Sequence, residues 1–236
     1  MRSAKEKIRR LLTHPAIWIP AGILLLGTVL LCSTDLDIAV VKFFYIRPAA
    51  ELEIGQRFPF AQWQPWKFLY DWGELPAWIV GCGGLAVWVA SFCWQRIIAW
   101  RDPGLFFALL LILGPGILVN AMCKPLWSRP RPHATTAFGG QGDYLPVWQR
   151  GTDREDSSLP SGHAAMGFYL MAPAFVCFRR RLRLAVLFMT IGILSGLAIG
   201  LARIVAGAHF PSDILWSAGL IYFPALLLAA LFRFTK

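Results

Sequence analysis

Two histidines, His163 and His209, are the residues of this 236-residue sequence whose side chains are best suited to nucleophilic and acid–base chemistry. His209 and Asp213 are four residues apart on either side of Pro211, so they share one face if a helix begins there. Asp213 is then expected to accept a hydrogen bond from one ring nitrogen of His209, which leaves the other nitrogen unprotonated for nucleophilic attack. His163 is expected to protonate the leaving oxygen and then to take a proton from the attacking water.

Three cations accompany these histidines, and they indicate which group is transferred. Lys124, Arg131 and Arg203 suit a phosphoryl group, because its negative charge is spread over oxygens that guanidinium groups bind in pairs. Pro160 is expected to open a helix whose first N–H groups, at Ser161 and Gly162, point at an oxyanion. Gly162 also lets the backbone approach closely.

The sequence therefore predicts phosphoryl transfer, with two sets of residues. The predicted catalytic residues are His209, His163 and Asp213, and the predicted phosphate-binding residues are Lys124, Arg131, Ser161, Gly162 and Arg203. No cluster of metal ligands is visible in the sequence, so we expect no metal and no cofactor, and activity in EDTA.

Other basic side chains are interpreted as structural. Arg129 is predicted to be a positioned surface cation, with a phosphate contact as the alternative. His133 is predicted to be a polar loop residue rather than a contact to substrate, and His14 is given no role. The basic cluster at residues 179–183 is interpreted as a signal for membrane topology.

The composition indicates a single integral membrane domain over residues 1–236. The chain is 57% apolar and only 15% charged, and its mean hydropathy is +0.55. Six uncharged runs approach the length that crosses a bilayer, which predicts an all-α bundle of six transmembrane helices. The predicted spans are residues 16–32, 76–94, 103–123, 160–178, 184–202 and 214–232.

The distribution of charge predicts how the bundle sits in the membrane. The side of the membrane that holds both termini carries 13 Lys/Arg and 2 Asp/Glu. The opposite side carries 10 Lys/Arg and 11 Asp/Glu. The positive-inside rule then places both termini in the cytoplasm, so the net charge of +10 reflects topology and calls for no nucleic acid. All three reactive stretches lie at external ends of spans, and the loops 124–159 and 203–213 are expected to form one active site.

The first external segment, residues 33–75, is rich in aromatic side chains. It is predicted to form short amphipathic helices along the membrane surface, and a lid or packing element without chemistry is the alternative. The five cysteines are predicted to be small buried apolar residues, with a disulfide framework as the weaker alternative.

At these motifs the chain resembles the type-2 phosphatidic acid phosphatase superfamily, the lipid phosphate phosphatases. The family signature is Lys-x6-Arg-Pro, Pro-Ser-Gly-His and Ser-Arg-x5-His-x3-Asp. It is matched by Lys124 and 131–132, by 160–163, and by Arg203, His209 and Asp213. Ala202 departs from the pattern, because it stands where the family has Ser, and the hydroxyl contact is lost.

The resemblance implies a metal-independent phosphatase that forms a phosphohistidine on His209, with His163 as acid and then base. It implies a lipid phosphate or diphosphate substrate, presented from the bilayer at the periplasmic face of a bacterial inner membrane. Lipid A, undecaprenyl diphosphate and phosphatidylglycerophosphate are the candidates, and residues 137–140 are similar to members that act on lipid A. A phosphotransferase with an acceptor lipid and a non-catalytic lipid-binding or transport protein are the alternatives, and the oligomeric state is left open.

Overall fold

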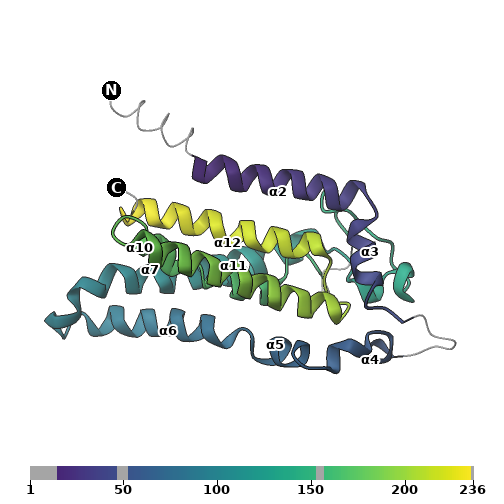
Figure 1. Cartoon of the computed structure of the whole chain (residues 1–236), viewed down its shortest axis with the longest axis horizontal. Helices are drawn as coiled ribbons and strands as arrows, with labels where there is room; N and C mark the ends of the chain where they lie inside the picture. The colour runs from purple at the N-terminus through teal and green to yellow at the C-terminus, as the bar shows by residue number, and fades with distance from the viewer. Residues whose placement is uncertain (1–14, 47–52, 153–156, 235–236) are drawn as a thin grey trace, which may run out of the picture.

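The computed structural model describes residues 15–46, 53–152 and 157–234. Within these ranges the regular structure is helical, apart from one isolated bridge between Thr135 and Gly142. Successive long helices run in opposite directions, so the segments predicted to be external gather at one end of the bundle (Figure 1). The predicted all-α membrane bundle is confirmed.

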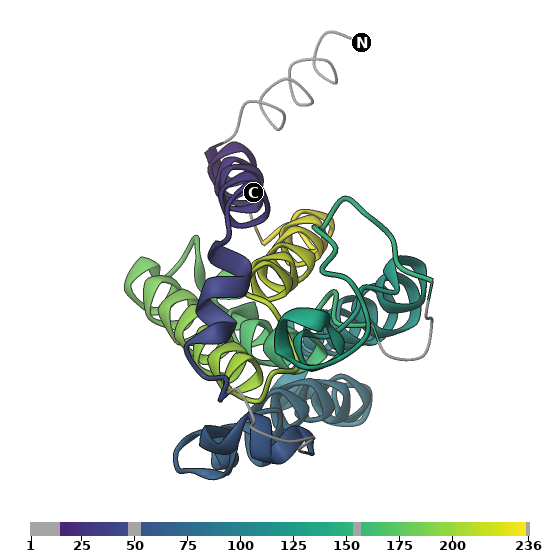
Figure 2. The same ribbon diagram turned by 90° about the vertical axis from the view of Figure 1, so that its right-hand side faces the viewer.

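Within the described residues, five helical stretches are long and apolar enough to cross a membrane. They are Pro15–Ser33, Trp66–Ala90, Gln95–Ala134, Leu182–Val205 and Pro211–Leu231. The first, fourth and fifth are single helices, α2, α11 and α12. The second combines α5 (Trp66–Trp72) with α6 (Leu75–Ala90), and the third combines η2 (Gln95–Trp100), α7 (Arg101–Leu111), η3 (Ile112–Cys123), α8 (Lys124–Trp127) and η4 (Pro132–Ala134). Helices α2 and α6 lie on opposite sides of the bundle (Figure 2).

The predicted span at residues 160–178 takes a different form. It consists of two short helices, α9 (Gly162–Tyr169) and α10 (Ala172–Cys177), and most of their side chains are buried. Helix α9 packs against α11, α12, η3 and α6, so it lies in the middle of the bundle. Five stretches have spanning length, and the count of six spans stays a prediction.

Small residues let α9 and α10 approach α11 closely. A Cβ atom added to Gly196 would lie 2.3 Å from the ring of Phe168, and one added to Gly192 would lie 2.3 Å from the backbone nitrogen of Met171. A Cβ on Gly167 would lie 2.7 Å from the Cα of Gly196. These contacts leave no room for side chains, and close packing of this kind is how helices associate inside a bilayer.

The helical segment directly before Lys124 has more residues per turn than an α-helix. Residues 112–123 form the π-helix η3, which contains Pro115. Proline has no N–H, so Pro115 donates no hydrogen bond to the preceding turn. Its carbonyl accepts a hydrogen bond from Nδ2 of Asn120 at 2.7 Å. π-Helical turns are frequent at functional sites, and this one ends directly before Lys124.

The first external segment forms the predicted short helices. They are α3 (Leu36–Lys42), α4 (Ile54–Arg57), η1 (Pro59–Gln62) and α5. Phe58 packs against Tyr45 and Phe138, and Arg57 donates to the carbonyl of Phe138 at 2.7 Å. Phe138 belongs to η5 (Thr136–Phe138), so this segment is attached to the loop 124–159.

The prediction that the cysteines are buried is wrong. Cys82 and Cys93 are exposed, and Cys32, Cys123 and Cys177 are partly exposed. All five are free thiols. Four of them lie in apolar helices, and Cys93 lies in the turn after α6. Hydropathy alone did not distinguish a core position from one on the outer surface of the bundle.

Candidate active site

The three predicted stretches meet at one end of the bundle. Lys124 begins α8, and a Cβ atom added to Gly162 would lie 3.5 Å from its Nζ atom. His163 interacts electrostatically with Lys124, Arg131, Arg203 and His209. The structure therefore brings the predicted phosphate-binding cations and both histidines into one cluster.

The loop that carries His209 is shaped by a left-handed turn at the end of α11. Gly207 has φ = +64°, a backbone conformation that favours glycine, and an added Cβ would lie 2.4 Å from the ring of Phe58. The N–H of Ala208 donates to the carbonyl of Arg203 at 3.0 Å, which closes the helix end. Helix α12 then starts at Pro211, where a missing N–H has no consequence.

His209 is almost completely buried, with 1% of its surface exposed. Its Nδ1 atom lies 2.6 Å from the carbonyl oxygen of Ser158 and 3.6 Å from Oδ2 of Asp213. A carbonyl oxygen only accepts, so Nδ1 carries the proton and Nε2 is unprotonated in the neutral ring. Asp213 interacts with His209 as expected, and the carbonyl of Ser158, which was not predicted, is the nearer partner of Nδ1.

Burial dominates the protonation of His209. It lowers the pKa of His209 to about 4, because the charged ring loses its hydration. Asp213 opposes this shift, and the charges of Arg203 and Arg131 add to it. The ring is therefore neutral at physiological pH, which is the form that a nucleophile requires.

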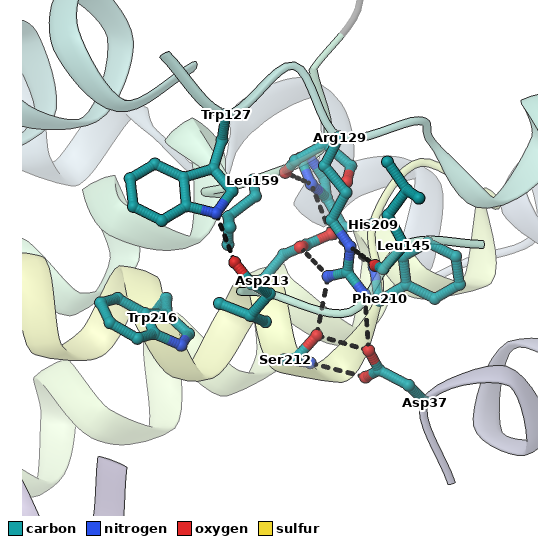
Figure 3. Close-up of polar contacts among 12 residues, drawn as sticks. Asp37, Trp127, Arg129, Leu145, Leu159, His209, Phe210, Ser212, Asp213 and Trp216 are labelled. Carbon is teal, nitrogen blue, oxygen red and sulfur yellow. Dashed lines mark hydrogen bonds and ion pairs between the residues drawn. The ribbon is translucent and has the colours of Figure 1, made fainter. Parts of the chain in front are cut away.

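Arg129 is the largest fully buried side chain of the site, and the prediction of a surface cation is wrong. Its Nη1 atom donates to Oδ1 of Asp213 at 2.5 Å and to Oγ of Ser212 at 2.8 Å (Figure 3). Its Nη2 atom donates to Oδ2 of Asp37 at 2.9 Å, and its Nε atom donates to the carbonyl of Leu145 at 2.7 Å. Arg129 thus holds Asp213 rather than a phosphate.

Asp37 is a buried carboxylate that the sequence analysis missed. It lies on α3 and accepts hydrogen bonds from the backbone N–H of Ser212 at 2.9 Å and from the hydroxyl of Tyr144 at 3.1 Å. Burial and the charge of Asp37 raise the pKa of Tyr144, so its hydroxyl remains a donor. Asp37 therefore attaches the first external segment to the start of α12.

The N-terminus of α9 differs from the prediction in one respect. The N–H of Ser161 was expected to face an oxyanion, but it donates to Oγ of Ser217 on α12 at 2.9 Å. The hydroxyl of Ser161 caps α9 by accepting from the N–H of Ala164 at 3.4 Å. A Cβ atom added to Gly162 would lie 2.9 Å from Oδ1 of Asn120, so the structure has no room for a side chain here; the approach of its backbone to a phosphate stays a prediction.

Arg203 is buried in the last turn of α11 with 4% of its surface exposed. Its guanidinium carbon lies 4.0 Å from the centre of the Tyr70 ring. Among the described residues, its Nε and Nη1 atoms have no hydrogen-bond partner although they are buried. Buried donors of this kind are rare, and an anion would satisfy them. Ala202, which replaces the family Ser, is buried beside Arg203.

His163 has a carboxylate partner that the sequence analysis did not predict. Oε1 of Glu74 lies 3.2 Å from its Nδ1 atom, and both side chains are about one third exposed. Glu74 and His163 line a pocket of about 190 Å³ between α6, η3 and α9. Trp78, Leu111, Pro115, Gly116, Asn120, Lys124, Gly162 and Met166 complete its lining. The pocket thus combines charged and polar side chains, namely Glu74, His163, Lys124 and Asn120, with apolar ones such as Trp78, Leu111 and Met166.

The remaining predicted residues are placed as follows. The N–H and Nδ1 of His133 both lie 3.0 Å from the carbonyl of Gly207, so His133 supports the loop of His209, as expected of a structural residue. His14 lies outside the described residues. The described residues contain no group of three or more His, Cys, Asp or Glu that could hold a metal ion.

Replacing Arg129 by methionine is predicted to destabilise the protein. The change leaves Asp37 and Asp213 buried without their cation, and breaking such a pair lowers the free energy of unfolding by about 3–5 kcal/mol. Denaturant titration in detergent micelles measures this loss. Arg150→Met, in the same loop but at an exposed position, is the control. Arg150 lies 5.3 Å from the centre of the Trp127 ring, and loss of this exposed contact is expected to change the value by at most about 1 kcal/mol. Equal stability of both variants would show that the buried network does not stabilise the fold.

Comparisons with known proteins identify the family. The family model of the PAP2 superfamily matches residues 104–235. Two relatives named "Lipid A 4'-phosphatase" are similar to the chain. The one from Francisella tularensis subsp. novicida (strain U112) is 30% identical over 57% of this chain and 60% of its own length. The one from Rhizobium leguminosarum is 34% identical over 60% of this chain and 63% of its own length.

The matches thus span about three fifths of these relatives. A third relative of the same name, from Rhizobium etli (strain ATCC 51251 / DSM 11541 / JCM 21823 / NBRC 15573 / CFN 42), is 35% identical over 50% of this chain and 46% of its own length. No solved structure matches. The family match covers more than half of the chain and includes all three motifs, so the resemblance inferred from them is confirmed: the chain belongs to the PAP2 superfamily.

Proposed function

We propose that this chain is a membrane-embedded phosphatase that removes a phosphate group from a lipid. The observation that carries the proposal is the unprotonated Nε2 of a buried His209 in the same cluster as Arg203, whose Nε and Nη1 are buried donors. Lys124, Arg131, Ser161 and Gly162 complete the proposed phosphate site. Membership in the PAP2 superfamily supports the assignment.

The proposed reaction proceeds in two steps. Nε2 of His209 attacks phosphorus, the bond from phosphorus to the lipid oxygen breaks, and that oxygen takes a proton from His163. Water then attacks the phosphohistidine and gives a proton to His163, and inorganic phosphate is released. Arg203 and the other cations stabilise the charge on the phosphoryl oxygens in both transition states. Asp213 and the carbonyl of Ser158 hold the His209 ring in place.

Lipid A is the first candidate substrate, because three relatives carry the name "Lipid A 4'-phosphatase". The apolar part of the pocket beside His163, formed by side chains such as Trp78, Leu111 and Met166, suits the lipid part of such a molecule. Undecaprenyl diphosphate and phosphatidylglycerophosphate are the other candidates.

His209→Gln is predicted to abolish turnover of lipid A that carries a labelled 4'-phosphate. The variant lacks the attacking nitrogen, so release of labelled inorganic phosphate falls by at least about 10³-fold. The purified protein is assayed in detergent with EDTA, since the proposed mechanism needs no metal. An unchanged unfolding midpoint shows that the variant is folded.

Two outcomes would contradict this assignment. Turnover by His209→Gln at the wild-type rate would remove His209 from the mechanism. Transfer of the label to a second lipid without release of inorganic phosphate would make the protein a phosphotransferase, the alternative that uses the same site.

The pKa of His209 predicts how its reactivity depends on pH. Because the pKa is lowered to about 4, the neutral nucleophile persists as the pH falls through 6.5, the ordinary value. It is lost only as the pH approaches 4. An NMR titration of ¹³C-labelled histidine, with the His209 signal identified by its absence in His209→Gln, measures this midpoint separately from ionisation of the substrate. A midpoint near 6.5 would contradict the predicted effect of burial.

We further propose that the site faces the exterior of a bacterial inner membrane and that both termini are cytoplasmic. The excess of basic residues on the opposite side of the spans supports this orientation. In a variant whose five native cysteines are replaced, Gln149→Cys is expected to react with a membrane-impermeant maleimide in intact spheroplasts. Arg181→Cys, on the opposite side, is expected to react only after permeabilisation. The reverse pattern would overturn the orientation.

A further inference from the structure

We infer that Glu74, in the turn between α5 and α6, is a positioning residue for His163. Its carboxylate lies 3.2 Å from Nδ1 of His163 and fixes the orientation and tautomer of that ring. The inference rests on the proposed role of His163 as the proton donor of the reaction. It assigns a function to the first external segment, for which the sequence suggested helices along the membrane surface, with a lid or packing element as the alternative.

The chemistry of the contact determines which nitrogen faces the substrate. An ionised carboxylate only accepts hydrogen bonds, so Nδ1 of His163 carries a proton. Nε2 is then the nitrogen that gives a proton to the leaving oxygen and takes one from water. A carboxylate that binds the far nitrogen of a catalytic imidazole also stabilises the charged ring, as in the Ser-His-Asp arrangement.

The charge balance around His163 makes this stabilisation necessary. Lys124 on α8, Arg131 in the following loop, Arg203 on α11 and His209 before α12 all act on His163, and the three cations oppose its protonation. The ring of Tyr70 on α5 lies 5.7 Å from the His163 ring. Glu74 supplies a negative charge at Nδ1, the nitrogen that takes no part in the proposed proton transfer.

The fold holds Glu74 in place by close packing of the turn before α6. A Cβ atom added to Gly73 would lie 2.8 Å from the side chain of Ile199 on α11. Glu74 occupies the N-cap position of α6, but its carboxylate makes no capping hydrogen bond to that helix. Its side chain is instead hydrogen-bonded with Trp78 and directed at His163. The contact is therefore not a by-product of helix capping.

The experiment compares Glu74→Gln with Asp71→Asn. Asp71 lies on α5 and forms an exposed ion pair with Lys67 at 2.9 Å, so it is a matched control in the same segment. Two substrates are used: a lipid phosphate with an alkoxide leaving group and an aryl phosphate with a nitrophenolate leaving group. Only the alkoxide requires a strong proton donor, so the two substrates separate proton donation from general damage.

For Glu74→Gln we expect kcat on the lipid phosphate to fall by about 10- to 100-fold with little change in KM. This loss is smaller than the full contribution of a general acid and base, because His163 itself remains. The alkaline limb of kcat moves to lower pH, because the charged ring has lost its counter-charge. The first-turnover burst of nitrophenolate, which precedes the water step shared by both substrates, changes much less, and Asp71→Asn behaves as wild type on both. Equal losses on both substrates with an unmoved alkaline limb would overturn the inference and leave Glu74 a structural residue.

A second measurement on the wild-type protein does not depend on the variant folding. ¹⁵N NMR of the neutral His163 ring is expected to show the proton on Nδ1, and a proton on Nε2 would overturn the inference. Failure of the proposed function would give a different result. If the protein is not a lipid phosphatase, the wild type releases no phosphate from any lipid, and the NMR measurement still determines the tautomer of His163.

Discussion

The burial of one arginine between two carboxylates constrains the whole external end of this bundle. Arg129 contacts Asp37 and Asp213 at 2.9 and 2.5 Å, and all three side chains are removed from water. In that environment each carboxylate needs the cation, because an uncompensated buried charge is strongly destabilising. The three charges lie in α3, in the loop after α8 and in α12, so their contacts tie these three segments together. The position of His209 follows from it, since Asp213 also accepts the N–H of Phe210 at 2.8 Å.

The two histidines are supported in the same way but sit in different surroundings. Each has an acceptor at Nδ1, the carbonyl of Ser158 for His209 and the carboxylate of Glu74 for His163, so Nε2 is the nitrogen available in both. A neutral carbonyl beside a buried ring keeps His209 uncharged, as the proposed nucleophile requires. The carboxylate of Glu74 lies beside a His163 ring that is about one third exposed, so this ring can exchange protons with water, as the proposed acid and base requires.

The sequence predicted that the motif residues lie together, because their spacing and their places at the ends of spans bring them to one side of the bundle. Lys124, His163, Arg203 and His209 belong together for that reason, and the cluster in the structure agrees. No motif or spacing in the sequence identified the groups that hydrogen-bond to these residues. Glu74 is an ordinary acidic residue in an aromatic segment, and Ser158 contributes only a backbone carbonyl. Arg129 was misinterpreted because a charge in an external loop is usually solvated, and burial cannot be read from a loop sequence.

By itself the sequence determined the class of the fold, the approximate limits of most long helices and the residues of the three motifs. Hydropathy and motif spacing are local properties, summed over neighbours along the chain, so no tertiary information was needed. The tertiary structure alone decided which partner each polar group takes. Ser217 occupies the N–H of Ser161, Asp37 reaches Ser212 across 175 residues, and Glu74 reaches His163. Such contacts depend on distances between packed helices, and the small residues that set those distances act only once the helices have met.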